Sequence, residues 1–233
     1  MGADPAYGSS EWADRFALVV FRCYADRLVQ VAEYCSPDIT TSSFAWIIAH
    51  LGGAYRHLYL NLELTGPGGA VQTELVSLQR TAGLVAVGNR TLGDVMGCIR
   101  HYMWQRPDMA HSGGYSRVVH WKTTKDSKSW LFNAYRDSFE LGRAEVKSTE
   151  LIEEMRQVTN NQGVIGAEGR AKDDRVVAAA LAHWIWLQTL KPSLMANHQT
   201  YEAARRREQQ FIPGVQQPVA NIVQHFLRKT NIA

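Results

Sequence analysis

Apolar and polar side chains alternate most regularly over residues 57–64. Leucines fall on one face of an extended chain there, and Tyr59, Asn61 and Glu63 fall on the other. A period of two predicts a strand with one face against the core. The run 65–69, which contains Gly and Pro, ends this strand, and residues 70–79 are expected to form a helix.

Two apolar segments nearer the N-terminus predict further strands. Residues 15–23 are almost entirely apolar, and residues 28–34 alternate. The short turn at 25–26 between them predicts an antiparallel hairpin. Hydroxyl side chains at 40–43 offer N-caps to a helix over 44–51, which the glycine pair that follows would end.

The middle of the chain has a less regular pattern. The predicted elements are, in order, a helix over 96–104, a loop over 107–115, a strand around 118–121, a helix from 123–126 to 139, and a helix around 151–155. Gly163, Gly166 and Gly169 then predict a flexible approach to the next helix.

That next helix begins in the sequence Ala-Lys-Asp-Asp-Arg-Val-Val-Ala-Ala-Ala-Leu, residues 171–181. Asp173 or Asp174 can cap the free N–H groups of its first turn and complement the helix dipole. The small side chains at 178–180 would let the helix approach a sheet closely. Taken alone, the Asp pair is explained by an acidic N-cap on a packed core helix.

The length fits one large domain, or one domain with an appendage. The chain has 233 residues, of which 45% are hydrophobic. After residue 190 the pattern is broken by prolines, glutamines and the basic run 205–207. We therefore divide the chain into a domain over 1–190 and a partly mobile C-terminal tail over 191–233, in which residues 221–229 could form a short amphipathic helix.

Charge and cysteine content exclude few functions. The net charge of +3 is compatible with nucleic-acid binding but does not argue for it. The three cysteines lie far apart in no metal-type spacing, which favours a reducing compartment. No apolar run reaches the roughly 18 residues of a membrane span, and the N-terminus lacks the features of a signal peptide.

Two further carboxylates stand at predicted strand ends. Asp4 follows a very short first strand, and Glu63 closes the strand 57–64 on its polar face. If these strands are neighbours, a helix packed across them brings Asp173 and Asp174 to the same place. Converging carboxylates repel one another unless a cation binds between them. Oxygen ligands suit Mg²⁺ or Mn²⁺, and two such ions about 4 Å apart would support phosphodiester cleavage.

Each carboxylate also has a simpler explanation. Asp4 can form an Asx-type turn before Pro5, and Glu63 can be a solvated residue at a strand end. Separately these signals are weak. The order in which the carboxylates occur along the predicted elements is what forms a pattern.

Three segments resemble the nuclease motifs of tailed-bacteriophage large terminase subunits. Asp4-Pro5-Ala6-Tyr7-Gly8, followed by Asp14 and an apolar strand, resembles the first motif. Residues 61–68, Asn-Leu-Glu-Leu-Thr-Gly-Pro-Gly, resemble the second, and residues 172–182 closely resemble the third. Residues 121–125 and 152–155 are similar to the family's spacer, so that the resemblance covers about residues 1–190.

The resemblance implies an α/β fold of the RNase H-like class, with a mixed central sheet and helices on both faces. It also implies a two-metal endonuclease that cuts concatemeric double-stranded DNA during packaging. Asp4, Glu63 and one or both of Asp173 and Asp174 would be the catalytic ligands of two Mg²⁺ or Mn²⁺ ions, with Asp4 bridging both.

The resemblance implies partners and a location as well. The expected partners are double-stranded DNA, the terminase ATPase motor domain, the small terminase subunit and the portal protein, with no membrane. The expected location is the cytoplasm of a bacterial host, at the procapsid.

The chain departs from the family's pattern in two ways. The glycine-containing run 66–69 is not followed by Lys and Ser or Thr, so it is no Walker A loop, and we interpret the chain as the nuclease part alone. Only three residues precede Asp4. A frayed sheet edge there would weaken a metal site that depends on Asp4.

Two alternative functions stay open. One is a junction resolvase or RNA–DNA hybrid nuclease of the same fold, and the other is a non-catalytic module that docks on DNA or on a portal protein. We interpret the eight histidines as structural or surface residues, since hard cations do not need imidazole. Lys122, Lys125 and Lys128, near Trp121 and Trp130, could line a phosphate track or simply begin a solvated helix.

Overall fold

The computed structural model describes residues 1–8, 14–55, 57–81, 86–87, 90–104, 120–161, 164–169 and 171–210. Its centre is a mixed six-stranded sheet in the order β7-β4-β1-β2-β3-β8. The strands are β1 (Gly2–Asp4), β2 (Phe16–Cys23), β3 (Leu28–Ser36), β4 (Leu58–Leu62), β7 (Ile99–His101) and β8 (Ala144–Glu145). β1 and β3 pair antiparallel to β2, whereas β4 runs parallel to both β1 and β7, and β8 runs parallel to β3.

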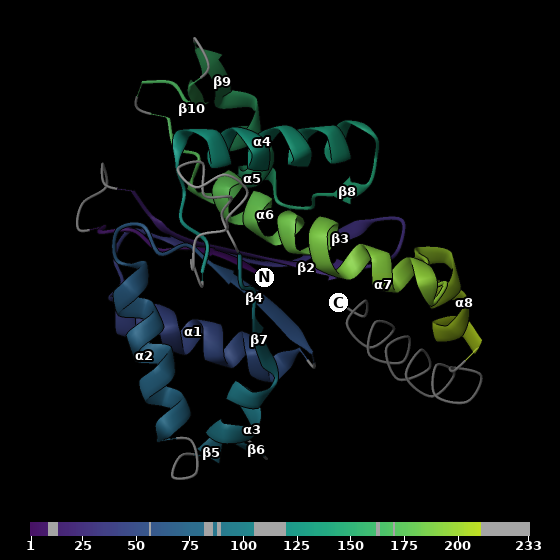
Figure 1. Cartoon of the computed structure of the whole chain (residues 1–233), viewed down its shortest axis with the longest axis horizontal. Coiled ribbons are helices and arrows are strands. Elements are labelled where there is room, and N and C mark those ends of the chain that lie inside the picture. Colours follow the sequence, from purple (N-terminus) through teal and green to yellow (C-terminus); the bar gives the residue numbers. More distant parts are fainter. Residues whose placement is uncertain are drawn as a thin grey trace, which may run out of the picture.

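Helices cover both faces of this sheet (Figure 1). One face carries α1 (Thr41–Ala54), α2 (Gly68–Arg80) and α3 (Leu92–Gly97), and the other carries α4 (Lys125–Glu140), α5 (Thr149–Gln157) and α6 (Asp174–Ile185). β2 lies between the two cores. Phe16, Leu18 and Val20 belong to the first core, and alternate residues of the same strand belong to the second. This double burial explains why the β2 sequence is almost entirely apolar, and the predicted α/β class is confirmed.

α6 packs against the sheet at unusually short range. A Cβ on Gly2 of β1 would lie 2.0 Å from the carbonyl oxygen of Ala178, so only glycine fits there. From the neighbouring strand, the Asn61 Nδ2 donates to the Leu181 carbonyl oxygen at 3.1 Å. The alanines of α6 therefore do what the sequence suggested and allow close approach to the sheet.

The first strand is not a frayed edge of the sheet. β1 is short, but it lies between β2 and β4 and is hydrogen-bonded on both sides. Ala3 is fully buried. A central strand with α6 on its face gives Asp4 the rigid support that a site residue needs.

Two other predictions need correction. The expected helix over 96–104 is instead α3 followed by β7, because a capping box at Thr91 and Asp94 begins the helix earlier and Ile99 pairs in parallel with Leu58. The glycine-containing approach to α6 forms an antiparallel hairpin of β9 (Val158–Asn161) and β10 (Val164–Ala167). A second small hairpin joins β5 (Ala86–Val87) and β6 (Arg90–Thr91).

Several predicted features lie wholly or partly outside the described residues. These are the loop over 107–115, most of the strand around 118–121, and the amphipathic helix over 221–229. Trp121 itself is described, and it makes a single parallel bridge to Glu63.

The chain continues beyond α6 as a helical arm. A π-helical turn, Trp186–Leu190, leads into α7 (Lys191–Ala196) and then α8 (Tyr201–Gln210). The arm contacts the β2–β3 turn, where the Ala25 N–H donates to Gln199 and the Tyr201 N–H donates to Asp26, both at 2.8 Å. Part of the predicted tail is thus helical, and a domain boundary at residue 190 stays a prediction.

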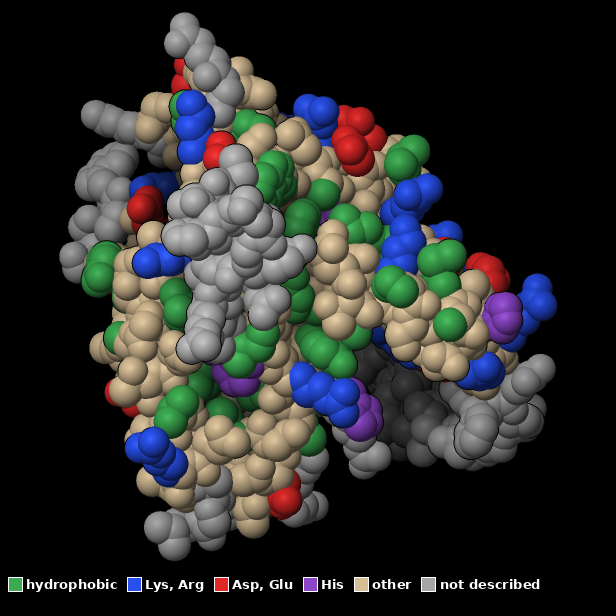
Figure 2. Space-filling model, in the orientation of Figure 1, with side chains coloured by type: hydrophobic (Ala, Val, Ile, Leu, Met, Phe, Trp, Pro, Cys, Tyr) green, Lys and Arg blue, Asp and Glu red, His purple; other side chains and the backbone are tan. Residues whose placement is uncertain are grey.

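Charge is dispersed over the surface that Figure 2 shows. Lys and Arg side chains are spread over several elements and mixed with acidic ones, without forming one continuous block on this face. Within the described part of the chain, no helix is long and apolar enough to cross a membrane.

Candidate active site

The ends of β1 and β4 bring two of the predicted carboxylates together. The strands run parallel with Ala3 opposite Leu62, and the Glu63 N–H donates to the Ala3 carbonyl oxygen at 3.0 Å. Asp4 and Glu63 therefore lie side by side at the C-terminal ends of neighbouring strands, as the sequence predicted. Glu63 is only 6% exposed, because the chain at Trp121 pairs beside it.

The turn after β4 is fitted tightly to Glu63. A Cβ on Gly68 would lie 1.8 Å from the Glu63 carbonyl oxygen, and Gly66 has a φ of +67° that favours glycine. α2 begins immediately after this turn. The glycines of the 61–68 motif thus fix where Glu63 stands, and they form no phosphate-binding loop of the Walker A kind.

Asp4 lies in a strongly acidic environment. Its pKa is raised well above the ordinary range by burial, by the negative charges of Glu63 and Asp174, by a hydrogen bond to the Glu63 side chain and, least, by Asp173. Two carboxyl groups in contact cannot both carry a charge without a compensating proton or cation. A bound cation would remove this conflict.

Asp174 lies in the first turn of α6 and is only 6% exposed. Burial raises the pKa of its carboxyl group, and the contact with Arg15 opposes that shift. The Arg15 Nε donates to Asp174 Oδ2 at 2.9 Å. Arg15 directly precedes β2, so the pair ties the start of α6 to the sheet.

Asp173 occupies the N-cap position of α6, but its side chain makes no capping hydrogen bond. It instead accepts from Lys128 Nζ at 2.7 Å and from the Ala167 N–H at 3.3 Å. The N–H of Arg175 is capped by Glu154 Oε2 of α5 at 2.9 Å. The simple explanation of the Asp pair as helix caps therefore does not describe what these side chains do.

Arg15, Glu154, Arg175 and Glu33 were not recognised as site residues from the sequence. Both arginines contact Glu154 Oε1, and the Arg175 Nε donates to Glu33 Oε1 at 2.6 Å. One signal was available, because Glu154 lies three positions after buried Leu151 and so shares the inner face of α5. A carboxylate on an apolar helix face indicates a buried charged partner.

The donor set suits a hard divalent cation, but the carboxylates are not arranged as a finished metal site. Among the described residues, no three His, Cys, Asp or Glu side chains form a group that could hold a metal ion. Lys128 and Arg15 neutralise Asp173 and Asp174, whereas Asp4 and Glu63 face each other with excess negative charge. Carboxylate oxygens of this kind fit Mg²⁺ or Mn²⁺. That all four residues ligate ions stays a prediction.

The other residues considered from the sequence have ordinary surroundings. His183 is buried, its Nε2 lies 2.8 Å from Ser138 Oγ, and burial lowers its pKa to about 4. Trp121 is fully buried, and Trp130 is exposed. Lys128 contacts Asp173 at the site and is not simply part of a solvated helix start.

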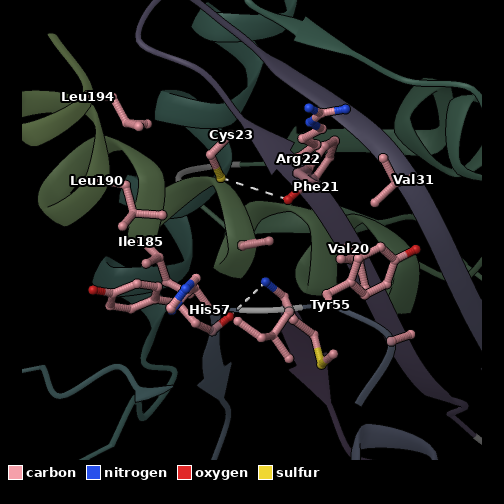
Figure 3. A pocket seen from close by; sticks show the side chains of 15 residues that line it. Val20, Phe21, Arg22, Cys23, Val31, Tyr55, His57, Ile185, Leu190 and Leu194 are labelled. Carbon is pink, nitrogen blue, oxygen red and sulfur yellow. Dashed lines mark hydrogen bonds between the residues drawn. The ribbon is translucent and has the colours of Figure 1, made fainter. Parts of the chain in front are cut away.

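A large cavity, whose lining side chains Figure 3 shows, lies at the start of β1, the end away from Asp4. It has a volume of about 580 Å³ and is lined by Met1 and Leu58, where β1 and β4 begin, and by Cys23, where β2 ends. Leu190 and Leu194 of the helical arm contribute to it. Its lining is mainly aliphatic and includes none of the four predicted site residues.

Solved structures of viral nucleases share this fold. The large terminase nuclease from thermophilic phage G20c with bound magnesium superposes with a TM-score of 0.52 and 19% identity, over 80% of this chain and 79% of that chain. The human cytomegalovirus terminase nuclease domain, Mn soaked and inhibitor bound, superposes with a TM-score of 0.51 and 15% identity, over 79% and 80%. No protein-family model and no curated protein matches the sequence.

The chain therefore has the RNase H-like fold of the terminase nuclease domains. The resemblance read from the three sequence motifs is confirmed at the level of fold.

Proposed function

We propose that this chain is a metal-dependent endonuclease that cleaves concatemeric double-stranded viral DNA during genome packaging, by two-metal phosphodiester hydrolysis. The observation that carries the proposal is the meeting of Asp4 and Glu63 at the ends of β1 and β4, beside the acidic start of α6. The fold shared with two viral terminase nucleases, one with bound magnesium and one soaked with manganese, adds support.

The carboxylates would provide the chemistry by holding cations in a rigid frame. Asp4, Glu63 and Asp174 would be the main ligands, and Asp173 would join them by leaving Lys128. Divalent ions held there would activate a water molecule and stabilise the leaving oxygen of a phosphodiester. The short β1 and the tight turn at Gly68 would keep the carboxylates in place, which such chemistry requires.

The proposal extends to partners and place of action. The substrate would be double-stranded DNA, delivered by a terminase ATPase motor that works with a small terminase subunit and a portal protein. Cutting would take place in the host cytoplasm at the procapsid. These roles rest on the motifs and on the fold that this chain shares with terminase nucleases.

Plasmid cleavage tests the proposal directly. The chain is incubated with supercoiled plasmid in Mn²⁺, Mg²⁺ or EDTA, beside Asp4→Asn and a matched Asp126→Asn variant, whose side chain is exposed on α4. We expect metal-dependent nicking and linearisation that Asp4→Asn abolishes and Asp126→Asn retains. Cleavage that persists in Asp4→Asn would reject the carboxylate site.

A non-catalytic docking module is the second candidate, and one observation favours it. Lys128 and Arg15 already neutralise Asp173 and Asp174, so these carboxylates are partnered without a metal. A parent chain that binds DNA but neither cleaves it nor binds Mn²⁺ at millimolar concentration would support this candidate. Preference for branched DNA or for an RNA–DNA hybrid would instead indicate the resolvase-like alternative.

A further inference from the structure

Five charged side chains form a connected network behind the candidate site. They are Arg15 before β2, Glu33 on β3, Glu154 on α5, and Asp174 and Arg175 on α6. All five are largely buried, with side-chain exposures between 8% and 22%. The network holds two positive and three negative charges, so its formal net charge is −1.

Glu154 is the centre of this network. Its Oε1 accepts from Arg15 Nη2 at 2.5 Å and from Arg175 Nη1 at 2.6 Å, while its Oε2 accepts from the Arg175 N–H at 2.9 Å. Three donors from two different segments therefore meet one carboxylate. The guanidinium of Arg15 is held by Glu154 at one end while its Nε contacts Asp174.

Arg15 limits how the Asp174 carboxylate can turn. Its Nε donates to Oδ2 at 2.9 Å, and a hydrogen bond from the Arg15 backbone also acts on this carboxylate. Glu154 fixes Nη2 of the same planar guanidinium, so the guanidinium cannot turn with the Asp174 carboxylate. Rotation of that carboxylate would therefore break its hydrogen bond with Arg15 Nε.

We propose that Arg15, held by Glu154, is a positioning residue that orients the Asp174 carboxylate for a divalent cation. This inference rests on the function proposed above and adds to it the residues that hold one predicted ligand in place. Groups that hydrogen-bond to metal ligands commonly change metal affinity about 10- to 100-fold when they are removed.

Calorimetric titration of Mn²⁺ into the full metal-free chain tests the proposal without relying on cleavage. The variants are Arg15→Gln, Arg15→Lys and Glu154→Gln, with Arg22→Gln as the matched control. Arg22 belongs to the same strand, β2, but pairs with Glu208 at the surface, where both side chains are more than half exposed.

We expect Arg15→Gln to raise the Kd for Mn²⁺ about 10- to 100-fold and Arg22→Gln to leave it unchanged. Arg15→Lys keeps the charge but loses the planar fork, so its Kd should lie between those of the parent and Arg15→Gln. Glu154→Gln should also weaken binding, because Arg15 loses its charged support. Circular dichroism establishes that each variant is folded.

A folded Arg15→Gln variant with parental or tighter Mn²⁺ binding would overturn the proposal and would mean that Arg15 merely competes with the metal. If Arg15→Gln does not fold, Arg15→Lys and Glu154→Gln decide in the same way. A parent chain that binds no Mn²⁺ would instead reject the proposed function itself, so the two failures are distinguishable.

Discussion

The two ends of the central sheet differ in what they bury. At the end where β1 and β4 finish, the protein buries carboxylates and their partners, with contacts such as Lys128 to Asp173 at 2.7 Å. At the other end it leaves a cavity of about 580 Å³ with a mainly aliphatic lining. The cavity therefore contains none of the residues proposed for the chemistry. Buried charge singles out the carboxylate end instead, because burying charge is costly unless a partner or a function requires it.

The comparison also explains why the charged end needs a rigid frame. Asp4, Glu63 and Asp174 come from three elements that are distant in the sequence but packed together through Gly2 and Asn61. The cavity end has no equivalent convergence of acidic groups along its lining. If this contrast is functional, substitutions at the two ends should affect different properties.

The largest expected effect concerns cleavage by the Asp pair. The charge of Asp174 raises the pKa of Asp4 more than that of Asp173 does, and Asp173 is paired with Lys128 at 2.7 Å. We therefore propose Asp174 as the principal ligand of the pair. We expect Asp174→Asn to reduce the cleavage rate about 10³-fold, since a bound metal contributes several kcal/mol and each 1.4 kcal/mol is about tenfold in rate. Asp173→Asn should cost less, about tenfold.

Leu194→Ala at the cavity end is the control for that experiment. Leu194 lines the cavity and takes part in none of the charged contacts. Its truncation should therefore leave the cleavage rate within about twofold of the parent's, a difference below about 0.5 kcal/mol. Loss of cleavage in Leu194→Ala would break the comparison, because it would tie the cavity to the chemistry.

The second prediction concerns pH. The pKa of Asp4 is raised in the folded protein, mainly by burial and by Glu63. The folded state then holds a proton that the unfolded chain releases near pH 4, so stability is lost as pH rises from there toward the folded pKa. By itself this contribution makes the metal-free parent less stable in urea at pH 7.5 than at pH 5, whereas buried His183, whose pKa is lowered to about 4, contributes in the opposite direction.

Asp4→Asn separates this effect from other titrating groups. The amide cannot ionise, so the variant should lose the part of the pH dependence that comes from Asp4. Added Mn²⁺ should stabilise the parent at pH 7.5 more than the variant, because a ligand that binds only the folded state raises its stability. An identical pH dependence in both proteins would contradict the assignment.

The third prediction uses two ion pairs of equal length. Arg175–Glu33 and Arg22–Glu208 both measure 2.6 Å, but the side chains of the first are 15% and 17% exposed and those of the second 51% and 56%. Glu33→Gln should lower the free energy of unfolding by about 2–3 kcal/mol, because it weakens a buried, charge-assisted hydrogen bond to Arg175, which keeps its contact with Glu154. Glu208→Gln should cost less than about 0.5 kcal/mol, as is usual for a surface pair.

Urea denaturation of both variants at pH 7.5 provides the measurement. Equal destabilisation by the two substitutions would show that distance, and not burial, sets the strength of these pairs. It would also remove the argument that the buried ion pairs at the charged end contribute more to stability than exposed ones do.

The sequence predicted the parts of this site that local pattern encodes. The alternating leucines located β4 and placed Glu63 at its polar end, and the apolar run after Asp174 located α6. The partners were not predictable in this way. Arg15 and Glu154 are separated by 139 positions. The periodicity of one segment does not specify which distant charged residue will pair with a residue of that segment. The β9–β10 hairpin was missed because its glycines resemble a loop until pairing with the other strand is known.

The smallest expected effect tests the frame of the site with two adjacent glycines at the start of α2. A Cβ on Gly68 would lie 1.8 Å from the Glu63 carbonyl oxygen, whereas a Cβ on Gly69 would meet nothing within 4 Å. Gly68→Ala should therefore destabilise the protein by about 1–3 kcal/mol, as overpacking does. Gly69→Ala should be neutral or should stabilise it by up to about 1 kcal/mol, because alanine restricts the unfolded chain.

The two variants should also differ in Mn²⁺ binding, because only Gly68→Ala forces the backbone of Glu63 to move. We expect Gly68→Ala to weaken binding in proportion to that displacement and Gly69→Ala to bind as the parent does. If Gly68→Ala is destabilised but binds Mn²⁺ normally, the position of Glu63 is not critical, and the ligand role of Glu63 would have to be abandoned. If both properties change together, the tight turn after β4 is part of the site as well as of the fold.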